Sequence, residues 1–336
     1  MKTPLRFGLI GCGCIGSLHA EHLATRVRGA TLAAVADSNL TAARTVAERF
    51  NVGSATDDYR RLLEDASIDA VVICSTTSTY TQFIQESAAH GKHTFCENPI
   101  GLDLERIAQA LQAVDKAGVK FQVGFNRRFD PSFVKAREMI ASGKIGRPHI
   151  LRISSRDPEP PPLEYVEASG GVFLDMTIHD FDMTRYLSGS EVEEIYAVGG
   201  ALVMPELGRL GEIDTCILTM RLKNGMLATI DNSLQSVYGY DQRVEVFGSG
   251  GMVMVSNRTP ENHTCFDSDG VHSAKPQYFF LERYQESYLA EMQEFVESIV
   301  QDRLPPVTGK DGLAPVIIGL AARKSLQEHR PVKITS

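Results

Sequence analysis

The sequence has no long hydrophobic run and no cluster of basic residues. No segment approaches the ~18 uninterrupted apolar residues of a membrane-spanning helix, and the apolar stretch that begins at Phe7 is broken at once by glycines. The 34 lysines and arginines are scattered, and the net charge of the 336-residue chain is −8. These absences argue against a membrane protein, a secretory signal peptide and a nucleic-acid-binding surface. We therefore expect a cytoplasmic protein that binds a small neutral or polar ligand.

Metal-binding and disulfide patterns are missing as well. The cysteines form no C-x-x-C pair, and the histidines show no metal-ligand spacing. Because most of the cysteines lie inside apolar runs, we expect reduced, buried thiols and no metal site. The cysteines are Cys12, Cys14, Cys74, Cys96, Cys216 and Cys265.

The length and pattern of the chain predict two domains. The 336 residues exceed one ordinary core of roughly 100–200 residues. Up to about residue 125, short apolar strands alternate with helical segments, which indicates right-handed βαβ units and a parallel sheet. The expected strands lie at residues 5–10, 31–36, 70–74, 94–96 and 120–123, with helices from the glycines after residue 10 to residue 24 and at 56–65, 82–90 and 104–117.

From about Arg147 the pattern changes to spaced, partly alternating strands with turn residues between them. This is typical of a mostly antiparallel sheet, and the proline-rich segment 158–162 is expected to form a loop. Two helices are expected near the end, and the first of them carries an acidic face. The second domain is therefore predicted to be α+β. Its expected strands are 149–157, 193–202, 214–222, 226–234, 243–249 and 251–257, and the late helices are 284–300 and 313–327.

A glycine motif lies between the first strand and the first helix. Gly11, Gly13 and Gly16 form G-x-G-x-x-G, in which the first glycine allows a tight turn and the second lets the backbone approach a pyrophosphate. The third permits close packing of the helix. The βαβ context favours dinucleotide binding over a purely structural turn. Cys12, Cys14 and Ile15 complete the expected cofactor-binding turn.

Asp37 closes the second strand at the offset where a carboxylate meets the adenosine ribose hydroxyls of a dinucleotide. Its negative charge would repel a 2′-phosphate, and Ser38 and Asn39 offer no arginine to relieve that repulsion. We expect NAD as the cofactor, with NADP as the alternative.

A histidine between carboxylates occurs in residues 170–186. Asp175, His179 and Asp182 fall at i, i+4 and i+7, so one continuous helix would place them on one face. Imidazole titrates near neutrality, and a carboxylate one turn away can orient it for acid–base work. The structural alternative is an N-cap with surface charges and a satisfied histidine. The accompanying dinucleotide motif, with no other suitable base, favours catalysis.

Seven stretches spread from end to end resemble the Gfo/Idh/MocA family of oxidoreductases, and within it the inositol 2-dehydrogenases. They are GLIGCGCIGSLHAEHL, GKHTFCENPIGLDL, VGFNRRFDPSF, GKIGRPHILRISSRDPEPPP, GGVFLDMTIHDFDMTRYL, YGYDQRVEVFGSGG and PPVTGKDGLAPVIIGLAARKS. The resemblance implies an N-terminal Rossmann parallel sheet and a second domain on a large open sheet, which usually forms the oligomer interface of a tetramer. The predicted fold class is thus α/β. Residues 1–125 would bind NAD, and residues 126–336 would bind substrate and oligomerise, with the C-terminal segment as a candidate to pack back on the first domain.

The resemblance also assigns roles by position. Asp175 and His179 match the substrate-binding aspartate and the general base of the family, and Asp182 lies beside them. Arg128 and Asp157 match positions near the substrate.

The remaining assignments concern the pocket wall and the nicotinamide. Tyr238 is expected to line the substrate pocket. Ser75, Thr76 and Thr79 follow the third expected strand, where the nicotinamide would lie, and Tyr80 replaces a histidine that is frequent in the family.

The departure from the family pattern is Asn98. Members usually read E-K-P, with the equivalent of Glu97 near the nicotinamide ribose and the lysine hydrogen-bonded to the reacting hydroxyl, whereas this chain reads Glu97-Asn98-Pro99. A fixed, cis-compatible geometry is expected at Pro99. Three accounts stay open: an engineered or variant form that is slow, a natural member in which His179 alone supplies the chemistry, or a non-catalytic sensor of NAD and sugar.

The resemblance therefore implies NAD-dependent oxidation of a cyclic polyol, with myo-inositol and its 2-keto product (scyllo-inosose) favoured and His179 as general base. Catalysis is expected to involve His179, Asp175 and Asn98, and to be weakened because Asn98 is uncharged. The alternatives are a dehydrogenase of another monosaccharide, such as glucose or an anhydrosugar, and a non-catalytic NAD- and sugar-binding regulator.

Overall fold

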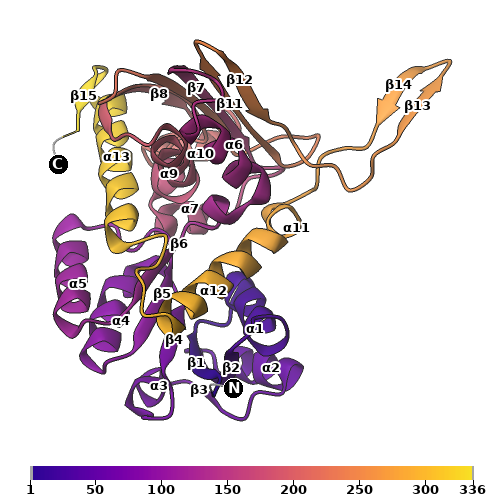
Figure 1. The fold of residues 1–336 in the computed structure, drawn as a ribbon. Coiled ribbons are helices and arrows are strands. Elements are labelled where there is room, and N and C mark those ends of the chain that lie inside the picture. Colours follow the sequence, from indigo (N-terminus) through magenta and orange to yellow (C-terminus); the bar gives the residue numbers. More distant parts are fainter. Residues whose placement is uncertain (1–2, 335–336) are drawn as a thin grey trace. The chain divides into compact units, whose positions relative to one another are not determined.

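The computed structural model describes residues 3–334, apart from the side chains of residues 167 and 168. Two compact units are present, each built on its own sheet (Figure 1). Unit 1 contains the chain up to Phe129 together with Glu286–Val316, and unit 2 contains Asp130–Gln285 and the chain from Ile317 onward. The predicted fold class is confirmed, because unit 1 holds a parallel sheet and unit 2 a mixed, mostly antiparallel one. The assignment of cofactor binding to residues 1–125 and of substrate binding and oligomerisation to residues 126–336 stays a prediction.

The sheet of unit 1 is fully parallel with the strand order β3-β2-β1-β4-β5-β6. Its strands are β1 (Leu5–Ile10), β2 (Ala30–Ala36), β3 (Ala55–Thr56), β4 (Ala70–Ile73), β5 (His93–Glu97) and β6 (Phe121–Gly124). Its helices are α1 (Cys14–Thr25), α2 (Leu40–Phe50), α3 (Arg60–Glu64), α4 (Thr77–Ala89), α5 (Leu104–Ala117), the 3₁₀ turn η1 (Asn126–Phe129) and α12 (Gln285–Val300). The strand order reverses between β1 and β4. In such sheets ligands bind outside the carboxyl ends of the strands at that reversal.

The late helix α12 belongs to the core of unit 1. The Phe295 ring lies 6.1 Å from the Phe7 ring and 6.0 Å from the Phe95 ring between centroids. All three side chains are fully buried, and each contributes roughly 1.5–3 kcal/mol relative to an exposed position. A segment distant in sequence therefore helps to fix strands β1 and β5, which carry the glycine motif and Glu97.

The sheet of unit 2 has the order β12-β11-β7-β10-β9-β8-β15, in which only the β7–β10 pair is parallel. Its strands are β7 (Pro148–Arg156), β8 (Val192–Gly200), β9 (Thr215–Leu222), β10 (Leu227–Ser233), β11 (Asp241–Gly248), β12 (Gly251–Val255) and β15 (Val332–Lys333). Its helices are α6 (Pro131–Ala141), α7 (Leu163–Ser169), α8 (Gly171–Asp175), α9 (Thr177–Ser188), α10 (Pro205–Arg209) and α11 (Phe280–Arg283), and α13 (Gly309–Glu328) begins in unit 1 and ends here. A separate hairpin joins β13 (Thr264–Asp267) to β14 (Gly270–Ser273).

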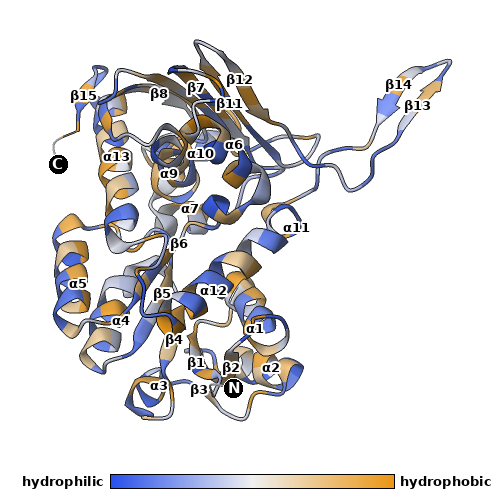
Figure 2. Cartoon of the chain, viewed as in Figure 1, coloured by the Kyte–Doolittle hydropathy of each residue, from blue (hydrophilic) through white to orange (hydrophobic). Residues whose placement is uncertain are grey.

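One face of this sheet is covered and the other is open. Along β9, Cys216, Leu218 and Met220 are buried, whereas Ile217 between them is 58% exposed. This alternation matches a strand with one face toward the helices. Figure 2 shows hydrophobic residues along β12 as well, and the hairpin β13–β14 stands apart with every residue from 258 to 273 exposed.

Several elements differ from the sequence-based expectation. Helix α2 was not expected, although the side chain of Asn39 caps it by accepting bonds from the amides of Thr41 and Ala42. The region 56–65 holds β3 and the short α3 instead of one helix, and α4 begins at Thr77, five residues before the predicted start at residue 82. The polar start of α4, TSTYTQ, lacks the apolar spacing that would mark it as helical.

Two expectations from composition can be compared with the structure. All six cysteines are free, as expected, but Cys14 and Cys265 are exposed, so the expectation of buried thiols is wrong for these two. Within residues 3–334, no helix combines the length and apolarity needed to span a bilayer.

Candidate active site

The glycine motif forms a close-packed turn at the end of β1. Gly11 has φ +98°, and a Cβ atom there would lie 2.5 Å from the carbonyl carbon of Cys74. A Cβ at Gly16 would lie 2.0 Å from the Gly11 oxygen, so any side chain at either position would displace backbone. Gly13 is the exposed N-cap of α1, and a Cβ there would meet nothing within 4 Å in the described part of the chain. The turn is therefore tight where it packs and open where a pyrophosphate would approach, which fits a dinucleotide.

Asp37 holds this turn from the end of β2. Its Oδ2 accepts a hydrogen bond from the Cys12 backbone amide at 2.7 Å, and its Oδ1 accepts one from the Asn39 backbone amide at 2.8 Å. A carboxylate has about four acceptor sites, so further lone pairs remain for ribose hydroxyls. Burial, followed by the Asp37 charge, raises the pKa of the Cys12 thiol to about 12, which keeps this thiol neutral.

Hydroxyl side chains follow β4 at the reversal of strand order. Ser75 Oγ and Thr79 Oγ1 are 2.7 Å apart, and Thr79 Oγ1 also donates to the Thr76 carbonyl at 2.7 Å. The three residues predicted to bind cofactor therefore form one hydrogen-bonded group at the start of α4.

The end of β5 is fixed against β6. Glu97 Oε1 accepts a hydrogen bond from His19 Nε2 at 2.7 Å, and a Cβ at Gly124 would lie 2.6 Å from Glu97 Oε2. Asn98 Nδ2 donates to the Gly124 carbonyl at 2.7 Å, and the Asn98–Pro99 peptide bond is cis. The last residue of β6 thus has no room for a side chain next to Glu97, and its carbonyl accepts one amide hydrogen of Asn98.

His19, Cys74 and Glu97 form the Glu97 cluster, in which one nitrogen, sulfur or oxygen atom of each residue lies within 4.8 Å of the others. These residue types can bind metals, but burial raises the pKa of the Cys74 thiol well above its usual 9.0, and His19 is already bonded to Glu97. A neutral thiol is a poor metal ligand. The cluster is therefore interpreted as a hydrogen-bonded group, and the absence of a metal site stays a prediction.

In unit 2, the predicted row of Asp175, His179 and Asp182 does not lie on one helix. Helix α8 ends at Asp175, Met176 interrupts the helix, and α9 starts at Thr177. The expectation of one continuous helix is therefore wrong at Met176. Asp175 ends α8, His179 lies in the first turn of α9, and Asp182 is only 1% exposed.

Asp175 has an environment suited to proton-dependent binding. Its Oδ1 accepts a hydrogen bond from the Tyr165 hydroxyl at 2.9 Å. Burial raises the pKa of Asp175 to about 6, against the opposing effect of the Tyr165 bond. After burial, the charges of Asp175 and Asp157 raise the pKa of the Tyr165 hydroxyl. Sequence reasoning missed Tyr165, whose segment shows only the turn signals of the preceding prolines.

Helix α9 is anchored by a buried polar network that sequence reasoning also missed. Asp180 accepts hydrogen bonds from Ser155 Oγ and from Asn232 Nδ2, both at 2.7 Å. Thr177 Oγ1 donates to Asn232 Oδ1 at 2.7 Å. These contacts tie the first turn of α9, and hence His179, to strands β7 and β10.

The other predicted substrate residues have partners of their own. The Asp157 amide donates to the Ser233 carbonyl at 3.0 Å, and this half-buried residue directly follows β7. Tyr238 donates from its hydroxyl to Asp241 at 2.6 Å, and in unit 1 Arg128 Nη2 lies 3.0 Å from Asp311. Their substrate contacts stay predictions.

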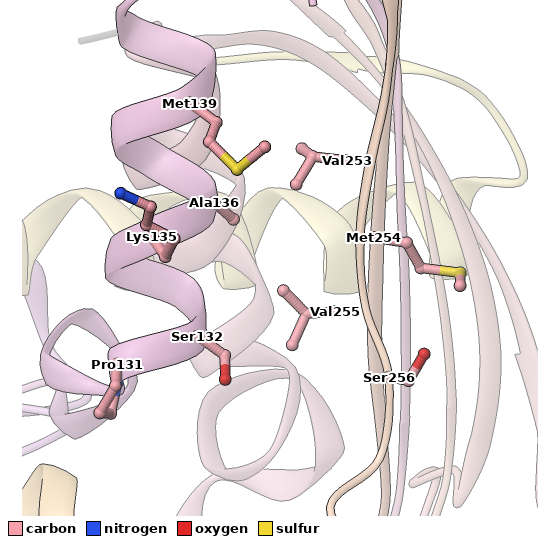
Figure 3. Close-up of a pocket in the computed structure, with 9 residues that line it drawn as sticks. All are labelled: Pro131, Ser132, Lys135, Ala136, Met139, Val253, Met254, Val255 and Ser256. Carbon is pink, nitrogen blue, oxygen red and sulfur yellow. The ribbon is translucent and has the colours of Figure 1, made fainter. Parts of the chain in front are cut away.

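A separate groove of about 420 Å³ lies between α6 and β12. Figure 3 shows Val253 and Val255 pointing toward the helix that carries Met139, with Met254 and Ser256 pointing away from it. The predicted site residues do not line it. Its lining consists of Pro131, Ser132, Lys135, Ala136, Met139, Val253, Met254, Val255 and Ser256.

Comparisons with known proteins find family models for the part of the chain that forms each sheet. A family model described as an oxidoreductase family with an NAD-binding Rossmann fold matches residues 5–125, and the GFO/IDH/MocA C-terminal domain matches residues 133–254. An uncharacterized oxidoreductase, YrbE of Bacillus subtilis, is 48% identical over 99% of this chain and 98% of its own length. The myo-inositol 2-dehydrogenase of Thermotoga maritima is 46% identical over 98% of each chain. The crystal structure of scyllo-inositol dehydrogenase from Lactobacillus casei, with bound NAD(H) and scyllo-inositol, covers 99% of this chain and 100% of its own at 31% identity and a TM-score of 0.93.

Proposed function

Because the chain belongs to the Gfo/Idh/MocA family of NAD-dependent oxidoreductases, we propose that it oxidises a cyclic polyol at a secondary hydroxyl. The favoured substrate is myo-inositol, oxidised at its axial hydroxyl to 2-keto-myo-inositol (scyllo-inosose), as the names of the relatives suggest. The observation that carries the proposal is the hydrogen bond from Tyr165 to Asp175, the last residue of α8, with His179 four residues further along the chain. Acidic acceptors of this kind suit several neutral hydroxyls better than a carboxylate.

The cofactor would be held by the glycine turn, the Asp37 carboxylate, the hydroxyls of residues 75, 76 and 79, and Glu97. When bound, NAD supplies the hydride acceptor. All of these residues belong to unit 1.

The chain's own chemistry begins at His179. Its imidazole takes the proton of the reacting hydroxyl, so negative charge develops on that oxygen. Asp175 and Asp157 accept hydrogen bonds from neighbouring hydroxyls and orient the ring. The second amide hydrogen of Asn98 stabilises the developing charge, but a neutral donor is roughly half as strong as a charged one. We therefore propose an active but slow enzyme.

A substrate comparison tests this function. Purified chain with NAD is mixed separately with myo-inositol, scyllo-inositol, glucose and an acyclic secondary alcohol, and absorbance at 340 nm is followed. We expect the fastest NADH formation with an inositol. Equal rates with the acyclic alcohol would contradict a cyclic polyol site, and a faster rate with glucose would favour the monosaccharide alternative.

The second candidate is a regulator that holds NAD and a sugar without turnover, and its one supporting observation is Asn98. Tight NADH binding together with no absorbance change for any polyol would favour it. A reaction with inositol would exclude it.

The Asp175 carboxyl predicts the acid limb of the pH profile. Its pKa of about 6 means that the carboxylate is lost as pH falls through 6, so kcat/KM should decline there. The Tyr165 hydrogen bond lowers this pKa, and Tyr165→Phe should therefore move the acid limb to higher pH. An exposed phenol gives the matched control, Tyr278→Phe, which should leave the limb in place. An unshifted limb in Tyr165→Phe would mean that another group, such as His179, controls it.

We also propose a homotetramer in the cytoplasm. The open face of the unit 2 sheet carries large apolar residues, and the register places them together, with Val198 opposite Ile217 and Phe247 opposite Met252. Exposed apolar patches of this kind mark protein interfaces. Light scattering should give about four times the 36.9 kDa chain mass, and a monomer would contradict the proposal. These exposed residues are Val198, Ile217, Leu227, Phe247, Met252 and Met254.

A further inference from the structure

Helices α7 and α8 form a short helical hairpin that ends at the proposed substrate acceptor. Gly170 ends α7 and directly precedes α8, and the backbone reverses there because Gly170 has φ +94° and Gly171 has φ +72°. At the open end of the hairpin, the Tyr165 hydroxyl donates to Asp175 at 2.9 Å. A helix as short as α8 is not stable by itself, so contacts with other elements must fix its position.

The turn of this hairpin is held by Arg323 on α13. Its Nη2 donates to the Gly170 carbonyl at 2.6 Å and to Glu212 Oε1 at 3.2 Å. Both side chains press on the turn, because a Cβ atom at Gly171 would collide with the Glu212 carboxylate and lie 3.1 Å from Arg323 Nη2. Hydrogen bonds from a charged donor are stronger than those from a neutral one. One guanidinium therefore links α13, the segment before β9 and the start of α8.

Helix α13 touches α8 at a second point, close to Asp175. Gly319 lies four residues before Arg323, so the two residues share one face of α13. A Cβ atom at Gly319 would lie 2.5 Å from Leu174 Cδ2 and 3.2 Å from the Phe173 carbonyl oxygen. The face of α13 that contains Gly319 and Arg323 thus contacts both ends of α8.

Helix α13 is itself attached to the sheet of unit 2. Ser325 Oγ accepts a hydrogen bond from the Ala197 amide on β8 at 3.0 Å, and it donates to the Arg330 carbonyl at 2.7 Å. The Ser325 side chain is fully buried. All of the contacts from α8 to β8 lie within unit 2, so α13 fixes α8 relative to this sheet.

We propose that Arg323 is a positioning residue for the substrate side of the site: by holding the turn of the hairpin, it keeps Asp175 in place at the other end of α8. His179 lies on α9, which the Asp180 network anchors separately. Loss of the Arg323 contacts should therefore weaken substrate binding more than proton transfer. The inference rests on the proposed role of Asp175 as an acceptor for substrate hydroxyls.

Two variants of Arg323 test the positioning role with the inositol as substrate. Arg323→Met removes the donor and keeps much of the stem, and it should raise the KM of the polyol about tenfold, as loss of a charged hydrogen bond would. Its kcat should stay within about threefold of the parent, and its Kd for NADH should not change. Arg323→Lys returns a charged donor and should recover most of the lost KM. Lys324→Met removes the same charge at the exposed next residue of α13 and should keep the parental KM.

A second measurement needs no substrate. The Met176 amide donates to the Val172 carbonyl at the end of α8, so its hydrogen exchange reports how firmly α8 is held. We expect about tenfold faster exchange in Arg323→Met and parental exchange in Lys324→Met. A folded Arg323→Met with parental exchange would overturn the proposal, and so would a parental polyol KM in that variant.

The same pair of measurements separates this inference from the proposed function. If the parent oxidised no polyol while Arg323→Met exchanged faster, the proposed function would fail and the positioning role would be supported. If Arg323→Met does not fold, Gly319→Ala replaces it, because the added methyl group pushes on Leu174 and the Phe173 carbonyl. Parental exchange at Met176 in a folded Gly319→Ala would overturn the proposal.

Discussion

His179→Ala is expected to lower kcat for the polyol by about 10²–10⁴-fold, the usual contribution of a general base. The imidazole is the proposed proton acceptor, and alanine leaves only water for that role. NADH affinity should be unchanged, because the glycine turn and Asp37 belong to unit 1. Stopped-flow or steady-state absorbance at 340 nm measures the rate, and fluorescence titration measures NADH binding.

The fold should tolerate this change. His179 is only half-buried, while Asp180 and Thr177 anchor α9 through Asn232 and do not depend on the imidazole. His263→Ala, at an exposed position near the hairpin, is the matched control and should keep the parental rate. If His179→Ala retained the parental kcat in a folded protein, the proposed mechanism would be wrong.

Asn98→Lys is expected to raise kcat for inositol by at least tenfold. An ammonium donor is roughly twice as strong as a neutral one toward a developing alkoxide, and about 3 kcal/mol of added transition-state stabilisation corresponds to about a hundredfold. The structure places residue 98 directly after β5, and the substitution exchanges the side-chain amide that donates to the Gly124 carbonyl for an ammonium donor. Ground-state binding should change little, since Asp175 and Asp157 supply the hydroxyl acceptors.

Asn262→Lys, which adds the same charge at an exposed position, controls for nonspecific electrostatics. A gain confined to residue 98 would identify a weakened enzyme. No gain at residue 98 would contradict the hypothesis that Asn98 weakens the enzyme. Combining Asn98→Lys with His179→Ala would then show whether residue 98 acts in the proton-transfer step.

Local spacing in the sequence predicted the strand-turn-helix geometry around the glycine motif better than the helix geometry around His179. The glycine motif and Asp37 are close in sequence, and their roles follow from the strand-turn-helix pattern. The additional bond from the Cys12 amide to Asp37 is a tertiary contact that such a pattern does not encode.

On the substrate side, periodicity suggested one helix through residues 175 to 182. No proline or glycine stands at Met176 or beside it. The i, i+4 and i+7 spacing of the polar residues therefore gave no sign that the helix is interrupted there. The network of Asp180 with Ser155 and Asn232 joins residues from three separate elements, which only the folded sheet brings together.

The burial of Glu291 on α12 is a further feature that the sequence pattern did not indicate. In the sequence this residue is one of several acids on a late helix and has the composition of a solvated surface. Its burial depends on how α12 packs across β5 and β6, a contact between segments far apart in the chain. Polar residues buried by such distant packing carry no local signal.

The shared support at Gly124 constrains how this enzyme can evolve. A Cβ at Gly124 would lie 2.6 Å from the Glu97 carboxylate, and the Gly124 carbonyl accepts a hydrogen bond from the Asn98 side chain, so both positions depend on the same residue. Substitutions at the two positions should therefore show epistasis, with paired changes departing from the sum of the single ones. When lysine replaces asparagine at position 98 during evolution, or the reverse, the effect on fitness should depend on Gly124. That residue takes no part in the chemistry.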